Sequence, residues 1–192
     1  MPHNTRDADL IGELTADHRK VRRLFDRIRA APPGSTARKE LADQVTAELV
    51  RHGAVEEKHL HPALRRHLPR GARWCEQDLA DHAAIERVLR ELGQQQPGEA
   101  EFDHLLVELI TRVTAHTLDE EQRLFPRLQA ACPAELLREL GEKTRTDRPT
   151  APARPRPSAP QLEPAHQPET PATGILGRIR GFLTARGRHA DG

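Results

Sequence analysis

Aromatic residues are scarce in this 192-residue sequence, which has four Phe, one Trp and no Tyr. β-Sandwiches, β-barrels and base-stacking platforms for nucleic acids depend on aromatic and β-branched side chains, so this composition disfavours all three. An excess of charge of one sign is also lacking, because 30 basic residues nearly balance 29 acidic ones. No overall electrostatic field attracts nucleic acid, and we therefore expect no nucleic-acid partner.

Cysteines and long apolar runs are equally rare. Cys75 and Cys132 are too few for a disulfide scaffold or a cysteine zinc site. No apolar run approaches the roughly 18 residues of a membrane span, and the N-terminus lacks the apolar core of a signal peptide. These absences predict a soluble protein of a reducing cytoplasm.

Apolar residues recur at helical spacing in four segments, near residues 10–28, 41–64, 79–92 and 102–124. No segment alternates over a useful length with the period of two that marks a strand. Pro62 interrupts the second segment and predicts a kink or a new helix start there. Four such helices with short connections predict an all-α fold, an antiparallel four-helix bundle.

The C-terminal part has a different composition. Residues 149–171 hold 8 of the 16 prolines, which is typical of a stiff, solvated linker that buries no core. We therefore expect the bundle in residues 1–140, a disordered proline-rich linker in residues 141–173, and a short basic amphipathic tail in residues 174–192. The tail is either a frayed helix without a specific partner or a docking helix for an anionic membrane surface or another protein.

Histidine is abundant, with 11 copies, and its positions reveal an internal repeat. When the sequence is shifted by 64 positions, several polar and apolar residues coincide. The shift places Asp17-His18 on Asp81-His82, His52 on His116, Glu56-Glu57 on Glu120-Glu121, Leu60 on Leu124, Pro62 on Pro126 and Leu64 on Leu128. The chain therefore carries two copies of one helical hairpin, whose equivalent residues face each other across the bundle.

Six of the repeated polar residues fall on the apolar faces of the predicted helices. They are His18, His52, Glu56, His82, His116 and Glu120. A buried imidazole must satisfy two nitrogens, and an unpaired buried carboxylate costs several kcal/mol. Metal ions are the simplest partner that satisfies all six residues together. The alternative is a set of core histidines that hydrogen-bond within the protein.

Other polar residues give weaker signals. His104 and Glu108 repeat the His-x-x-x-Glu spacing, but their helical angle predicts a surface pair. His59 lies on the face of the candidate site and is either a supporting donor or a partly exposed residue at the bundle's end. Glu57 and Glu121 point about 100° away from that face, which favours solvent exposure or a capping contact.

The order His…His-x-x-x-Glu…His…His-x-x-x-Glu, with Pro62 and Pro126 after the two pairs, resembles the bacterial cation-binding domain of the hemerythrin family over roughly residues 7–140. The resemblance implies a four-helix bundle around a non-haem di-iron centre, bridged by two carboxylates and an oxo or hydroxo group. It makes four residues terminal ligands, His18, His52, His82 and His116, and two residues bridging ligands, Glu56 and Glu120.

One position departs from the oxygen-carrying members of that family. They have a further histidine one turn after the third, where this chain has Glu86. Glu86 lies on the face of His82, and we expect it to be a further metal ligand. Its repeat equivalent is Arg22, so the two irons would be inequivalent. A carboxylate in place of an imidazole stabilises ferric iron, which argues against reversible oxygen carriage. The alternative places Glu86 outside the coordination sphere or in solvent.

The resemblance implies that the centre binds dioxygen, nitric oxide or peroxide for sensing or detoxification. The absence of Tyr excludes a tyrosyl-radical mechanism, and electrons would come from an external donor. Two alternatives remain. One is an enzyme that disproportionates peroxide, with Glu86 moving protons. The other is a binding module in which iron occupancy regulates the stability of the bundle and the tail passes that state to a partner. Manganese and zinc are alternatives to iron.

Overall fold

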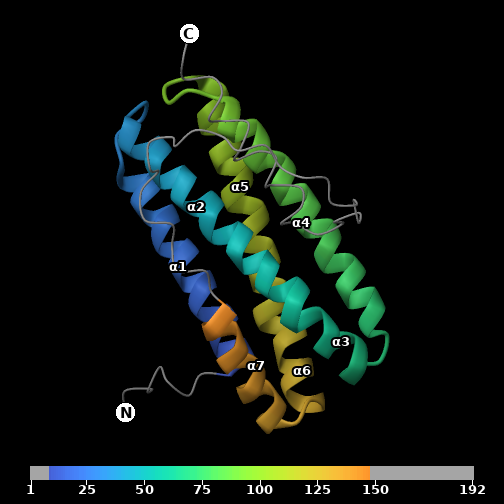
Figure 1. Ribbon diagram of the computed structural model, residues 1–192. Helices are drawn as coiled ribbons and strands as arrows, with labels where there is room; N and C mark the ends of the chain where they lie inside the picture. Colours follow the sequence, from blue (N-terminus) through green and yellow to red (C-terminus); the bar gives the residue numbers. More distant parts are fainter. Residues whose placement is uncertain (1–8, 148–192) are drawn as a thin grey trace, which may run out of the picture.

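The four segments with helical periodicity form the four long helices of the computed structural model, which describes residues 9–147 (Figure 1). Within this range the chain is helical with short turns and has no strand, so the predicted all-α bundle is confirmed. The long helices are α1 (Leu10–Ala30), α2 (Thr36–Val55), α4 (Gly71–Gln94) and α5 (Ala100–Asp119). None of the described helices is long and apolar enough to cross a membrane.

Helices α1 and α2 pack together as one hairpin, and α4 and α5 pack together as the other (Figure 1). Side chains at the predicted caps begin the first hairpin. The Asp9 carboxylate accepts a hydrogen bond from Gly12 N at 2.8 Å, and Ser35 Oγ accepts one from Arg38 N at 3.3 Å. These caps satisfy backbone N–H groups that the first turn of each helix leaves without a helical partner.

The turns of the two hairpins use glycine in the same way. Gly34 has φ 75° and Gly98 has φ 99°, a backbone conformation that side chains other than glycine's rarely adopt. The two residues are 64 positions apart and lie against each other, because a Cβ added to Gly34 would lie 3.4 Å from Gly98 Cα. The repeat in the sequence is therefore a repeat in the structure, with the two turns in contact.

The winding of the chain changes where the second helix of each hairpin ends. A π-helical segment follows each one: η2 (Glu56–Leu60) after α2 and η3 (Glu120–Leu124) after α5. Short helices α3 (His61–His67) and α6 (Phe125–Ala131) then continue in the same direction, with Pro62 and Pro126 in their first turns. Proline has no N–H to donate, and the first turn of a helix is where that loss costs least. At Pro62 the expected new helix start is α3, which follows the π-helical segment η2.

A further helix, α7 (Ala134–Asp147), packs alongside α1 (Figure 1). It buries Leu137, Gly141 and Thr144, and Arg145 Nη1 donates to Glu13 Oε1 at 2.9 Å. The folded bundle therefore extends seven residues past the predicted boundary at residue 140. Residues 141–147 are all small or polar, so they show no apolar periodicity from which a helix could be predicted. The predicted linker beyond residue 147 and the predicted tail lie outside the described residues.

Two apolar clusters fill the bundle and leave a polar layer between them. The cluster near the hairpin turns includes Phe25, Val45, Leu89 and Phe102. The cluster at the opposite end includes Leu14, Leu64, Phe125 and Leu128. The histidines and glutamates of the repeat occupy the layer between the clusters, so the fold holds a polar site inside an otherwise apolar core.

Candidate metal centre

Six residues predicted to share a site are brought together in this layer, and all six are buried. Each of the four long helices supplies one histidine, and the first residue of each π-helical segment supplies one glutamate. The residues are His18 from α1, His52 from α2, Glu56 from η2, His82 from α4, His116 from α5 and Glu120 from η3. Helix winding tends to depart from the α form at functional sites, as it does here.

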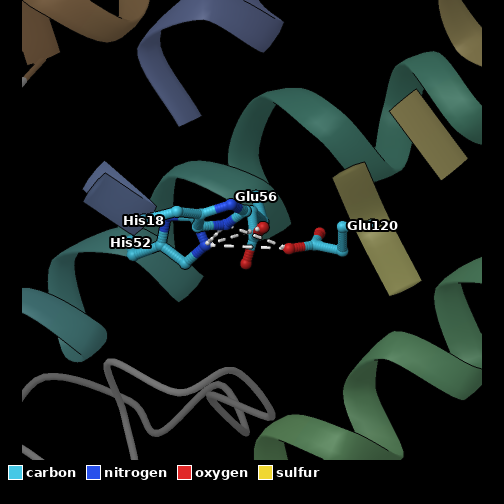
Figure 2. Close-up of side chains that lie close together, drawn as sticks. All are labelled: His18, His52, Glu56 and Glu120. Carbon is cyan, nitrogen blue, oxygen red and sulfur yellow. Dashed lines mark hydrogen bonds and ion pairs between the residues drawn. The ribbon is translucent and has the colours of Figure 1, made fainter. Parts of the chain in front are cut away.

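One half of the site surrounds His18 and His52, whose Nε2 atoms lie 3.0 Å apart (Figure 2). Glu56 Oε1 lies 3.0 Å from His52 Nε2, and Glu120 Oε2 lies 3.2 Å from His18 Nε2. Donor atoms of these four residues all lie within 4.8 Å of one another. Two nitrogens and two carboxylate oxygens converging on one point are a donor set for a metal ion.

The other half surrounds His82 and His116 and mirrors the first. Their ring centroids are 4.9 Å apart, against 4.7 Å for His18 and His52. Glu56 Oε2 lies 3.1 Å from His82 Nε2, so the two oxygens of Glu56 face different halves. Glu120 Oε2 lies 3.4 Å from His116 Nε2 as well as near His18. Both carboxylates are therefore shared between two donor groups.

The shared carboxylates pair with histidine rings at ion-pair distances but have no hydrogen bonds of their own among the described residues. Both oxygens of Glu56 and of Glu120 are inaccessible to solvent, and their contacts with histidine lack hydrogen-bonding geometry. A buried charged oxygen without hydrogen bonds is costly unless a cation compensates it. The donor set therefore fits metal ions between the two histidine pairs.

The pKa values of the site without metal point the same way. Burial, together with the charge of Glu56, raises the pKa of Glu120 well above its usual value. At Glu56, burial acts in the same direction, but His52 and His82 outweigh it and hold the pKa well below its usual value. Burial also opposes charge on His52, yet Glu56 and Asp17 raise its pKa to about 10. The raised pKa values of Glu120 and His52 show that positive charge is favourable in this layer, and a bound cation would supply it.

Outer carboxylates orient the histidines of the first half. His18 Nδ1 donates to Glu121 Oε1 at 2.8 Å, and Arg22 Nη2 donates to the same oxygen at 3.0 Å. This bond leaves the His18 Nε2 lone pair directed at the site, as metal-binding histidines require. Burial and the neighbouring His52 lower the pKa of His18 to about 4, which keeps the ring neutral.

Glu121 was expected to point away from the site, and the structure corrects this. The angular estimate assumed 3.6 residues per turn, whereas Glu121 lies in the wider π-helical segment η3. Its carboxylate consequently reaches α1.

The aspartates repeated before His18 and His82 face the outer nitrogens of the other two histidines. Asp17 Oδ2 lies 3.8 Å from His52 Nδ1, and Asp81 Oδ2 lies 4.0 Å from His116 Nδ1. Both distances are those of ion pairs and are longer than a hydrogen bond, so the aspartates contribute negative charge beside these rings. The repetition of the aspartates thus has a structural counterpart.

Glu86 is buried beside this cluster. It lines a small cavity together with His52, His82 and His116, and the remaining walls are apolar: Leu49, Val50, Ile85 and Leu89. Solvent exposure, one of the two alternatives for Glu86, is therefore wrong. Among the described residues, however, the groups of converging donor atoms do not include Glu86.

Sequence reasoning missed a buried pair on the same side. His61 Nε2 donates to Asp78 Oδ2 at 2.6 Å, and both residues are buried. A donor atom of Asp78 lies within 4.8 Å of donor atoms of His116 and Glu120. Asp78 comes four residues before His82 and so shares its helical face, which is a signal that the sequence contains. His61 follows the π-turn and gives no comparable signal.

The remaining polar candidates lie away from the centre. His104 is exposed, and Glu108 accepts a hydrogen bond from Arg112 Nε at 2.7 Å. His59 is buried, but its Nε2 lies 3.0 Å from Asp147 Oδ2 of α7. His59 therefore ties the π-helical segment η2 to the last helix.

An antiparallel bundle whose four long helices each direct one histidine at two shared carboxylates is the arrangement of a hemerythrin-like cation-binding protein. The chain belongs to the hemerythrin family: residues 9–128 match the hemerythrin HHE cation binding domain. An uncharacterized hemerythrin-like protein of Schizosaccharomyces pombe is 27% identical over 161 residues, which cover 83% of this chain and 77% of the relative.

A solved structure is similar as well. The crystal structure of a hemerythrin HHE cation binding domain-containing protein from Mycobacterium kansasii matches with a TM-score of 0.63 and 25% identity. The match covers 72% of this chain and 84% of that chain. The predicted family membership is thereby confirmed.

Proposed function

We propose that this protein holds a di-iron centre and binds a small oxidant or diatomic molecule there, namely dioxygen, nitric oxide or peroxide, for sensing or detoxification. The observation that carries the proposal is that Glu56 and Glu120, which converge with His18 and His52, each also belong to a donor group containing His116. Imidazole and carboxylate donors in this mixture suit iron. Bound iron would supply a redox-active Lewis acid to the site.

The cavity beside the centre supports a small ligand. It offers about 20 Å³ for the centre of a water-sized molecule, which is room for one such molecule and little more. Its walls include apolar side chains from α2 and α4, such as Leu49 and Ile85. Such walls exclude bulk water and larger substrates, while His52, His82 and His116 border the same space.

Glu86 favours a second candidate, peroxide disproportionation. It is the one carboxylate that borders the cavity among the residues lining it. A carboxyl group next to a bound peroxide can hold and return a proton, which that reaction requires at each peroxide oxygen. Reducing equivalents for any other redox reaction would come from an external donor. The third candidate, a regulatory module, depends on residues beyond the described range.

Anaerobic reconstitution tests the proposal. The full chain is incubated with ferrous iron, its metal is counted, and absorption spectra are recorded after separate addition of dioxygen, nitric oxide and peroxide. We expect two irons per chain and a spectral change with at least one ligand. His116→Ala should lower the iron count, because it removes a converging nitrogen. The matched control is His104→Ala, an exposed histidine on the same helix. An equal iron count in both variants would contradict the site.

A further inference from the structure

The two halves of the centre differ in the residues that flank them. The 64-residue repeat relates Asp78 to Leu14 and His61 to Phe125. All four residues are buried, with exposed fractions of 5%, 0%, 2% and 2% in that order. A polar pair in one half of the bundle therefore takes the place of an apolar pair in the other.

The polar pair faces the ion position between His82 and His116. Asp78 Oδ2, which accepts the hydrogen bond from His61, lies 3.7 Å from His82 Nε2. Asp78 Oδ1 lies 3.9 Å from His116 Nδ1, the outer nitrogen of that ring, so Oδ2 is the oxygen that faces the ion position. Donor atoms bound to one ion at about 2.1 Å lie about 3–4 Å from each other. The Asp78 carboxylate is thus within reach of the ion that His82 would bind.

The apolar pair faces the ion position between His18 and His52. Phe125 stacks on the His18 ring at a centroid distance of 5.8 Å and an interplanar angle of 10°. Leu14 lies one turn before His18 on α1, as Asp78 lies one turn before His82 on α4. Neither Phe125 nor Leu14 carries a donor atom. The carboxylate oxygens that converge with His18 and His52 are those shared between the two halves.

Burial of Asp78 is costly unless its charge is compensated. A buried carboxylate with a single hydrogen-bond donor leaves acceptor sites unsatisfied, and a bound cation would satisfy them. His61 fixes one oxygen of Asp78 and so holds the carboxylate against the centre. In this arrangement His61 is a positioning residue and Asp78 faces the ion.

We propose that Asp78, held by His61, is an additional ligand of the metal ion between His82 and His116. This proposal rests on the proposed metal centre and adds that its two ion positions have different ligands. Hard carboxylate donors favour harder, more highly charged ions. The position with Asp78 binds its ion more tightly than the position flanked by Phe125, and the two irons are spectroscopically distinct.

The test uses substitutions that the chain itself suggests. Asp78→Asn keeps the size of the side chain and removes its charge. The double variant His61→Phe with Asp78→Leu copies the pair of the other half, which the core already packs. Phe125→Leu is the matched control, because it changes packing in the other half without removing a donor.

Each full-length protein is titrated anaerobically with ferrous iron, and binding is followed by calorimetry and by competition with a chelator. We expect two binding steps in the unmodified chain, and a loss of at least about tenfold in the tighter step of Asp78→Asn. Phe125→Leu should keep that step. Mössbauer spectra of the oxidised proteins should show two distinct irons, which become more alike in the double variant.

Unchanged affinities and spectra in both Asp78 variants would overturn the assignment of Asp78 while leaving the metal centre in place. Failure of the unmodified chain to bind iron would instead overturn the proposed function itself. Circular dichroism of the metal-free proteins checks folding. If the double variant does not fold, the isosteric Asp78→Asn decides.

Discussion

At the scale of single residues, Glu86 is the position at which the reactivity of the proposed centre can be tested. Glu86 is the residue that the resemblance matches to a further histidine of the oxygen carriers, and it is buried at the cavity wall. A negative charge close to iron stabilises the ferric state relative to the ferrous one. If iron is bound in the proposed centre, a Glu86 carboxylate would favour oxidation of the iron by its ligand over release of the ligand unchanged.

The first prediction follows from this charge. The reduced protein should oxidise quickly in air without reversible oxygen uptake, and any peroxide consumption should depend on Glu86. Glu86→His should prolong the phase of reversible oxygen uptake and slow peroxide consumption, as measured by stopped-flow absorption and an oxygen electrode. Reversible oxygen uptake by the unmodified protein, with identical behaviour of the variant, would remove Glu86 from the centre's chemistry.

A second residue acts through its hydrogen bond to a ligand. Glu121 holds the His18 ring, and the bonds from His18 and Arg22, acting against burial, lower the pKa of its carboxyl. Glu121→Gln should weaken iron binding by about tenfold, because outer partners of metal-binding histidines have effects of this size. The control is Asp119→Asn, whose carboxylate pairs with exposed Arg123 instead. Equal affinities of the two variants in chelator competition would contradict the role of Glu121.

Helical periodicity in the sequence predicts some residues of the candidate site and not others. The six repeated histidines and glutamates could be placed in one site because α-helical periodicity puts them on inward faces. Glu121 and His61 could not, because both lie in or after a π-helical turn where that periodicity fails. Asp78 could have been found from its spacing to His82, but its repeat equivalent is a leucine, so the repeat concealed it.

At the scale of elements, the turn between α3 and α4 sets the distance between His61 and Asp78. The helices approach so closely there that a Cβ added to Gly71 would lie 2.0 Å from the backbone oxygen of Leu64. Neither backbone can move without moving its helix. The φ of Gly71 is not positive, so the backbone conformation does not require glycine here. The lack of space for a Cβ atom does.

The third prediction is that Gly71→Ala destabilises the fold by about 1–3 kcal/mol, the usual cost of forcing extra atoms into a packed region. Urea unfolding of the metal-free protein measures it. Arg73→Ala, an exposed change in the next turn, should alter the stability by no more than about 0.5 kcal/mol. A Gly71→Ala variant as stable as this control would mean that α3 and α4 separate easily, and His61 would then be a poor anchor for Asp78.

At the scale of the whole molecule, the polar layer divides the core into two apolar clusters. Metal ions between the histidine pairs would join the four long helices at this layer. The fourth prediction is that iron raises the thermal unfolding temperature, because the folded bundle binds the ion and the unfolded chain does not assemble the site. Calorimetry with and without a chelator measures the difference. A chelator that leaves the temperature of the iron-loaded protein unchanged would contradict the coupling of metal to fold.

The C-terminal boundary gives the last prediction. Helix α7 covers α1, and Asp147 at its end accepts hydrogen bonds from Lys58 and His59 of η2, at 2.8 and 3.0 Å. These contacts hold the segment that begins with Glu56. A chain that ends after residue 147 should therefore keep the unfolding temperature and iron content of the full chain. A chain that ends after residue 133 should lose both in part.

The loss on removing α7 follows from two contacts of different kinds. The apolar cluster would lose Leu137, and burial of one such side chain contributes about 1.5–3 kcal/mol. The contacts of Asp147 with Lys58 and His59 would also be lost. This would loosen the segment that contains Glu56 but would remove none of the metal-binding side chains. Unfolding scans and iron counts on the two truncated chains separate these effects. A drop in either quantity for the chain ending after residue 147 would instead show that residues 148–192 stabilise the bundle.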